Sequence, residues 1–232
     1  MDTSPIVIDI ETAPLPNARD YCDPPDLSDV TAPSNYKDAE KIAAFIAQAK
    51  IDKVVAFERD LAEKAALDWH VGCIVGIGWW TQEGGLHSRM CYTEDHERDA
   101  LEEVWRTCQH RTIVGFNIKM FDVKFMSMRS RYLGVPYPVL DLGKFARQGI
   151  TDLYLELTFG DGKFDQGVMR RTLQSFCRRF GIPVADPISG ADVPRLIAAG
   201  EWAAVRAHME SDVWLEVQLA QKMGIISAVG TR

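Results

Sequence analysis

Short apolar runs alternate with longer amphipathic stretches along most of the chain. The first run, residues 5–12 (PIVIDIET), is rich in β-branched residues and predicts a buried strand. Four more runs predict further strands, at residues 71–80, about 86–92, 112–116 and 139–142. The Gly84-Gly85 pair predicts a turn between the second and third strands, so we expect a mixed sheet with antiparallel pairing on one side.

Apolar residues recur at helical spacing between and after these strands. Residues 13–36 are rich in proline and aspartate and predict a long surface loop, which two helical patterns follow at 37–50 and 54–67. Thr93 is the expected N-cap of a helix that ends near Gln109. Four further helices are expected, at about 121–132, 172–180, 192–199 and 201–223. This element order predicts an α/β, ribonuclease H-like mixed sheet flanked by helices, with a helical insertion after the first strand.

At 232 residues, with a hydrophobic fraction of 47%, the chain is long enough to bury a sizeable core. We expect one domain spanning residues 1–232, in which about 20–67 form the loop and the helical insertion. No run approaches the ~20 apolar residues of a membrane span. The five cysteines are odd in number and form no Cys-x-x-Cys pair, which disfavours a disulfide framework and a thiolate zinc site. We therefore expect a soluble, intracellular, cytoplasmic protein with no membrane partner and no signal peptide.

Two carboxylates, Asp9 and Glu11, interrupt the first apolar run. Side chains alternate faces along a strand, so both point the same way, about 6.5–7 Å apart along the backbone. Like charges in a buried strand resist desolvation unless a cation compensates them, and oxygen ligands suit Mg²⁺ or Mn²⁺. The alternative is a strand end whose carboxylates face water.

A second polar cluster follows the predicted strand at 112–116, where Asn117 lies in a short loop and Asp122 opens the next helix. The ends of strands in α/β sheets are common positions for functional sites. The alternative for Asp122 is an acid that the helix dipole alone favours. Phe121 and Phe125 are one helical turn apart and suit either the core or stacking on bases.

A third cluster lies in the last predicted helix, where His208 and Asp212 are spaced i and i+4 and share one face. Both border the apolar stripe of that helix, so the carboxylate needs a partner. The alternative is a His–Asp pair with no catalytic role. Glu210 and Glu216, in the same helix, are expected to face solvent.

These three clusters occur in the order and spacing of three exonuclease motifs: Asp9-Ile10-Glu11, Asn117 with Phe121-Asp122, and His208 with Asp212. The chain thereby resembles the DEDD superfamily of 3′→5′ exonucleases. An asparagine followed after three residues by Phe-Asp is particularly similar to the proofreading domains of family B DNA polymerases and their stand-alone relatives. Those proteins usually carry tyrosine at the position of His208. The histidine-bearing branch usually spaces its histidine one residue further from the last aspartate.

The resemblance implies two-metal hydrolysis with Mg²⁺ or Mn²⁺. Asp9, Glu11 and Asp212 would hold one ion, and Asp9 with Asp122 would hold a second about 3.5–4 Å away. His208 would orient or deprotonate the attacking water. Asn117 and Phe121 would hold the terminal nucleotide.

The charge is unevenly distributed: the whole chain carries −7, yet residues 111–181 contain twelve Lys or Arg and six Asp or Glu. If these basic residues share a face, that face would attract a phosphate backbone. The alternative is that they are scattered over solvated helix faces. The expected contacts with a nucleic-acid strand are Lys163, Arg170 and Arg171, around the glycine-rich stretch 160–167.

Together, the motifs and the resemblance imply a 3′→5′ exonuclease that acts on single-stranded DNA 3′ ends and releases mononucleotides. An exoribonuclease is an open alternative, because no feature of the sequence indicates whether the 2′-hydroxyl group of RNA is recognised. A nucleic-acid-binding module that kept the fold and lost catalysis is another. The sequence shows no polymerase motif, so a role in replication or repair would require a partner in trans.

Overall fold

The computed structural model describes residues 4–143, 149–159 and 171–227. The chain divides into two compact units, one formed by residues 1–13 and 73–232 and the other by residues 14–72. The insertion expected at about 20–67 lies within the second unit. Among the described residues, no helix is long and apolar enough to cross a membrane.

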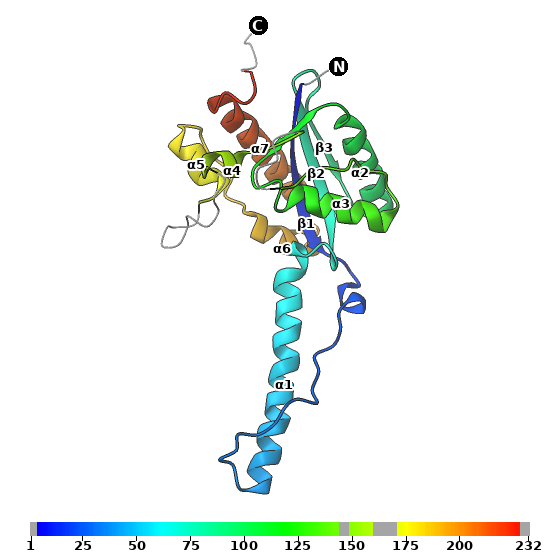
Figure 1. Cartoon of the computed structure of the whole chain (residues 1–232), viewed down its shortest axis with the longest axis vertical. Coiled ribbons are helices and arrows are strands. Elements are labelled where there is room, and N and C mark those ends of the chain that lie inside the picture. Colours follow the sequence, from blue (N-terminus) through cyan, green and yellow to red (C-terminus); the bar gives the residue numbers. More distant parts are fainter. Residues whose placement is uncertain (1–3, 144–148, 160–170, 228–232) are drawn as a thin grey trace. The chain divides into compact units, whose positions relative to one another are not determined.

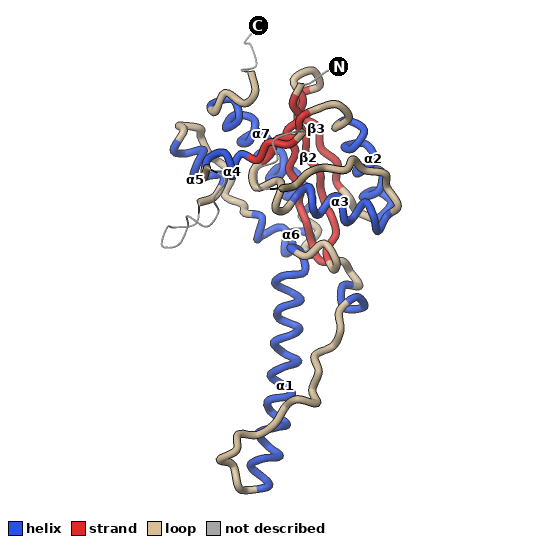
Figure 2. Tube along the Cα trace, viewed as in Figure 1, coloured by secondary structure: helices blue, strands red, loops and turns tan. Residues whose placement is uncertain are grey.

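A five-stranded sheet, with the strand order β3-β2-β1-β4-β5, forms the centre of the first unit (Figures 1 and 2). β2 and β3 pair antiparallel, whereas β1 with β4 and β4 with β5 pair parallel. The predicted ribonuclease H-like α/β fold, a mixed sheet flanked by helices, is therefore confirmed. The strands are β1 (Pro5–Pro14), β2 (Gly72–Thr81), β3 (Gly85–Met90), β4 (Thr112–Gly115) and β5 (Ile150–Asp152).

The fifth strand is not where the sequence predicts it. Residues 139–142 are irregular, and Val139 is 99% exposed. Pro136 and Pro138 lie just before this segment and have no N–H to donate to a neighbouring strand. The edge of the sheet is formed instead by the three residues of β5, a strand too short to give a hydrophobic pattern.

Helices of the first unit begin and end close to the predicted positions, and α2 starts at the predicted cap, where Thr93 Oγ1 accepts a hydrogen bond from the His96 N–H. α3 ends before Gly134, whose φ of 71° is left-handed. A short helix, α4, was not predicted. The helices are α2 (Glu94–Thr107), α3 (Asp122–Leu133), α4 (Leu153–Leu157), α5 (Leu173–Arg179), α6 (Val193–Ala198) and α7 (Trp202–Lys222).

The second unit contains one long helix, α1 (Ala39–Lys64), where the sequence predicts two. The helix begins at Asp38, whose carboxylate accepts hydrogen bonds from the N–H groups of Glu40 and Lys41. No proline or glycine occurs within α1, so nothing interrupts its backbone hydrogen bonds near Ile51. None of its residues is buried in the described structure, and Ile51 is 56% exposed.

Helices cover both faces of the sheet, with α2 and α3 on one side and α7 on the other (Figure 1). α7 approaches the sheet closely because β2 carries glycines beneath it. A Cβ atom at Gly78 would lie 2.8 Å from Val213 Cγ2, and one at Gly76 would lie 2.9 Å from Met209 Sδ. Larger residues at these positions would therefore push α7 away from the strands.

A buried ion pair joins α2 to α3. Arg129 donates to both carboxylate oxygens of Glu97 at 2.8 Å, and both side chains are at most 3% exposed. Glu97 Oε1 also accepts a hydrogen bond from the Ile74 N–H of β2. The pair therefore holds two helices and a strand together.

Replacing Arg129 with methionine should lower the free energy of unfolding by roughly 3–5 kcal/mol, because it leaves the Glu97 charge buried without a partner. Denaturant unfolding would measure this. The matched control is Arg89→Met, which breaks an exposed pair with Glu103 (58% and 35% exposed side chains) and should cost under about 1 kcal/mol. Equal effects of the two changes would contradict this interpretation.

Candidate active site

The acids of β1, Asp9 and Glu11, lie on the sheet face that α7 covers. Alternation along the strand puts them on the same face as Val7 and Ala13. Val7 belongs to one buried apolar cluster and Ala13 to another, and both clusters contain residues of α7. The two carboxylates therefore lie along the strand between two apolar clusters, in a position that restricts water.

α7 brings His208 and Asp212 to these acids. His208 is only 2% exposed, and its Nε2 atom lies 3.5 Å from Glu11 Oε1 and 3.9 Å from Asp212 Oδ2. Gln174 of α5 lies on the other side, with its Nε2 atom 3.4 Å from Asp212 Oδ1. The structure thus brings together the predicted residues of β1 and α7, which are about 200 positions apart in the chain.

Asp122, at the start of α3, reaches β1 where β4 has ended. The parallel pairing of β1 with β4 runs only from Pro5 to Val7, so the later backbone groups of β1 on that side have no strand partner among the described residues. Asp122 Oδ1 accepts a hydrogen bond from the Ile10 N–H at 3.2 Å, between the two acids of β1. Asp122 is 5% exposed. The short β4 therefore makes room for the third acid.

The loop between β4 and α3 has a tight and well-anchored backbone. Gly115 is required at the end of β4, because a Cβ atom there would lie 2.8 Å from the Ile8 carbonyl oxygen. Asn117 has a φ of 61°, a left-handed conformation that asparagine tolerates better than most residues. Asp152, which the sequence analysis did not single out, accepts hydrogen bonds from the N–H groups of Asn117 and Lys119. This anchoring fixes the direction in which α3 begins.

Glu216 does not face solvent as the sequence predicts. It is 2% exposed, and its Oε1 atom accepts a hydrogen bond from the Phe116 N–H at 2.9 Å. Its Oε2 atom is buried and has no hydrogen-bond partner among the described residues. The spacing of Glu216 four residues after Asp212 puts both on one helix face, a signal that could have been read from the sequence. Glu210 is also partly covered, since Ser88 donates to it at 2.5 Å.

Asp186 is a second residue that sequence reasoning missed. Its Oδ2 atom lies 2.6 Å from His208 Nδ1, and its side chain is 15% exposed. Asp186 comes from the segment between α5 and α6, so no helical or strand spacing relates it to His208. Only the fold brings the two side chains together.

The predicted substrate-binding residues differ in position. Phe125 is fully buried core, whereas Phe121 is half-buried, with its ring centroid 5.6 Å from that of Phe125. Asn117 is also partly exposed, and Arg171 is exposed just before α5. Lys163 and Arg170 lie outside the described residues.

Not all of the basic residues of segment 111–181 are available to a ligand. Arg129 is buried in its ion pair, and Lys119 is only 3% exposed. Arg111 pairs with Glu83. Arg178 and Arg179, at the end of α5, are exposed with Arg171. The whole segment therefore does not form one basic face, and a face built from its exposed residues stays a prediction.

Burial and mutual repulsion raise the pKa of five carboxyl groups at the site. Burial raises the pKa of Asp122 to about 7, although backbone hydrogen bonds partly oppose the shift. The pKa of Asp212 is also raised by burial, with the neighbouring His208 side chain acting in the opposite direction. The pKa values of three further acids lie well above the usual range, those of Asp9, Glu11 and Glu216. Burial is the largest cause, and the neighbouring acids add to it.

The donor set fits a hard divalent cation. Within the described residues, no Lys or Arg forms an ion pair with any of these five carboxylates. Glu216 Oε2 is an unpartnered buried oxygen beside them. In the described part of the chain, no three His, Cys, Asp or Glu side chains already form a coordination shell, so the side chains would have to move to bind an ion. Oxygen ligands of this kind suit Mg²⁺ or Mn²⁺.

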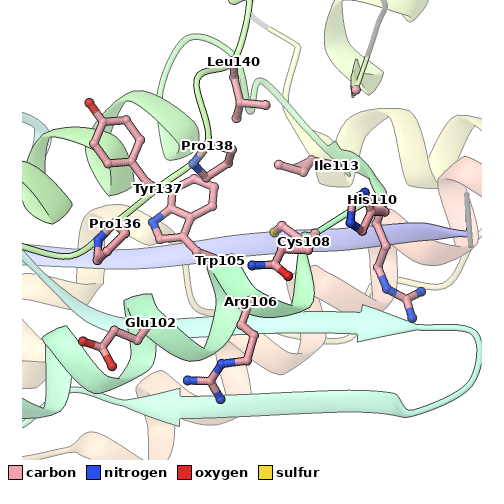
Figure 3. Close-up of a pocket in the computed structure, with 13 residues that line it drawn as sticks. Glu102, Trp105, Arg106, Cys108, His110, Ile113, Pro136, Tyr137, Pro138 and Leu140 are labelled. Carbon is pink, nitrogen blue, oxygen red and sulfur yellow. The ribbon is translucent and has the colours of Figure 1, made fainter. Parts of the chain in front are cut away.

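A separate pocket of about 940 Å³ lies between α2 and the segment after α3 (Figure 3). Trp105, Pro136, Tyr137 and Pro138 line it together with residues near the end of α2. In the described part of the chain, none of the carboxylates discussed above lines this pocket. It is therefore distinct from the candidate site.

The chain is similar in fold to a family B DNA polymerase. No protein-family model matches the chain. No curated protein matches its sequence either. The structure of the family B DNA polymerase from the hyperthermophilic archaeon Pyrobaculum calidifontis is similar with a TM-score of 0.59 and 17% sequence identity, over 96% of this chain and 25% of the polymerase chain. The chain thus spans about a quarter of that polymerase, and at this identity the similarity shows the fold alone.

The raised carboxyl pKa values predict how stability changes with pH. A group whose pKa rises from about 4 when unfolded to about 7 when folded stabilises the fold below pH 4, and this contribution is lost as the pH rises through 7. The metal-free protein should therefore melt at a lower temperature at pH 7.5 than at pH 5.5, and Mn²⁺ should raise the melting temperature more at pH 7.5. Thermal unfolding at both pH values measures this.

The matched variant is Asp122→Asn, which keeps an oxygen acceptor for the Ile10 N–H and removes the charge. Its melting temperature should exceed that of the wild type at pH 7.5 without metal and should respond less to Mn²⁺. A wild-type protein whose Mn²⁺ response is the same at both pH values would contradict the prediction.

Proposed function

We propose that the protein is a metal-dependent 3′→5′ exonuclease that hydrolyses phosphodiester bonds at the 3′ ends of single-stranded DNA. One observation supports the proposal above all others. Four acids from three distant segments of the ribonuclease H-like fold act on one another, two of them, Glu11 and Asp212, lie beside His208, and the four are the acids of the DEDD pattern: Asp9, Glu11, Asp122 and Asp212. The fold similarity to a DNA polymerase agrees with a nucleic-acid substrate.

In this proposal, Asp9, Glu11 and Asp212 hold one Mg²⁺ or Mn²⁺ ion, and Asp9 and Asp122 hold a second. Bound ions of this kind lower the pKa of water and stabilise negative charge on a leaving oxygen. Asp9 serves both positions because the other acids lie around it, and their charges all act on its carboxyl group.

His208 is held in a suitable orientation for proton transfer. When its Nδ1–H group donates to Asp186, the Nε2 atom is left as an acceptor on the side of Glu11 and Asp212. A water molecule between these groups would lose its proton to Nε2. Asp186 thus selects the tautomer that general-base catalysis needs.

The substrate would lie along the exposed residues around the acids. Phe121 offers part of its ring for stacking on the terminal base, and Asn117 lies at the preceding turn. Arg171 is exposed three residues before Gln174, which contacts Asp212, and is proposed to bind a backbone phosphate together with Lys163 and Arg170. A replication or repair partner acting in trans is part of the proposal.

The direct test is digestion of 5′-labelled single-stranded DNA, double-stranded DNA and RNA with Mn²⁺. Wild-type protein should give a ladder that shortens from the 3′ end, fastest on single-stranded DNA. Asp9→Asn should slow digestion by roughly a hundredfold or more, because it removes a charge shared by both ion positions. The matched control is Glu102→Gln, an exposed acid of α2, which should digest at the wild-type rate.

Three results would contradict the proposal. An Asp9→Asn variant as fast as the wild type would overturn the assignment of the acids. Faster digestion of RNA would indicate an exoribonuclease. A gel shift without any shortening would indicate a binding module that lacks catalysis.

Asp186→Asn should lower the rate constant roughly a hundredfold and leave Mn²⁺ affinity unchanged, because an asparagine amide stabilises the wrong imidazole tautomer. Single-turnover digestion and Mn²⁺ calorimetry would measure the two quantities. The control is Asp192→Asn. Asp192 lies in the same segment between α5 and α6 but accepts hydrogen bonds from Ser189, so this variant should behave as wild type. An active Asp186→Asn protein would mean that the contact with His208 is only structural.

A further inference from the structure

Glu216 is a buried carboxylate that the proposed chemistry does not use. Its two oxygens have different surroundings. Oε1 accepts the Phe116 N–H at 2.9 Å and so fixes the backbone where β4 ends. Oε2 is buried and has no hydrogen-bond partner among the described residues, in a side chain that is 2% exposed overall.

A structural role explains only one of these oxygens. A glutamine would accept the Phe116 N–H equally well and would carry no charge into the interior. A buried carboxylate oxygen without a donor destabilises the folded protein, and more so because the group is charged. The charge at Glu216 therefore needs another explanation.

The charged side chains that act on Glu216 are also acidic. Asp122 and Asp212 act on it directly, and its own charge is the strongest of those that act on Asp9. It follows Asp212 by one helical turn on the same face of α7. Oε2 is thus an oxygen without a hydrogen-bond partner among the described residues, and its side chain interacts with the acids to which the proposed function assigns the second ion.

We propose that Glu216 is a fifth metal-binding carboxylate. Oε1 anchors the loop before α3, and Oε2 helps to hold the divalent ion assigned to Asp9 and Asp122. One side chain thereby couples the position of this ion to the backbone of the loop that carries Asn117. This inference rests on the metal sites of the proposed function.

The test is Mn²⁺ binding without nucleic acid, measured by calorimetry and by the Mn²⁺-induced rise in melting temperature. Glu216→Gln should fold, melt no lower than wild type without metal, and bind Mn²⁺ roughly 10- to 100-fold more weakly. Glu216→Asp keeps the charge and should bind more tightly than the glutamine variant. The matched control is Glu210→Gln, in the same helix, which should leave Mn²⁺ affinity unchanged.

Equal Mn²⁺ affinity of Glu216→Gln and wild type would overturn the inference, as would a wild-type protein that binds no Mn²⁺. So would a Glu216→Asp variant no better than the glutamine variant. The exonuclease proposal fails separately: wild-type protein that binds Mn²⁺ through Glu216 yet digests no nucleic acid would leave this metal assignment standing. If digestion depends on Asp9 but the Glu216→Gln variant binds Mn²⁺ as tightly as the wild type, the exonuclease proposal stands and the metal assignment of Glu216 fails.

Discussion

The repulsion among the carboxylates that β1, α3 and α7 bring together is the constraint on which the site depends. Desolvation penalises each charge, and the neighbouring charges penalise it again. The protein offsets only part of this cost, with N–H donors from Ile10 and Phe116 and the side-chain amide of Gln174. Hydrogen bonds of this kind orient carboxylates without neutralising them. A divalent cation at this position would convert the repulsion into attraction, and the repulsion therefore supports the proposed metal site.

Packing around the site holds the acids close despite their repulsion. The glycines of β2 let α7 lie against the sheet, so its polar residues reach β1. The early end of β4 leaves a free backbone donor at Ile10 that captures Asp122. On the other face of the sheet, the Arg129–Glu97 pair fixes α3 to α2. Because Asp122 is the first residue of α3, the pair also helps to position this acid. Each acid is therefore positioned by an element whose own packing is apolar or ion-paired.

Local patterns in the sequence are sufficient to predict much of this architecture. The β-branched run of β1, the cap at Thr93 and the helix stop at Gly134 each have a physical cause within a few residues. The failures had other causes. β5 is too short for a pattern, and the Asp186–His208 contact depends on tertiary structure alone. The burial of Glu216 has a different cause: its helical spacing from Asp212 is visible in the sequence, whereas the sheet that covers this face of α7 is a feature of the tertiary structure.

The contact with Asp186 also bears on the unusual position of His208. A tyrosine at this position would present a single hydroxyl group to the site, whereas a histidine has two ring nitrogens. At 2% exposure, the second nitrogen requires a partner inside the protein, since an unpaired buried polar group is costly. Asp186 supplies that partner at 2.6 Å and directs Nε2 toward the acids. In the proposed site, a histidine at the tyrosine spacing therefore needs a partner such as this aspartate, and the proposal treats the two residues as one unit.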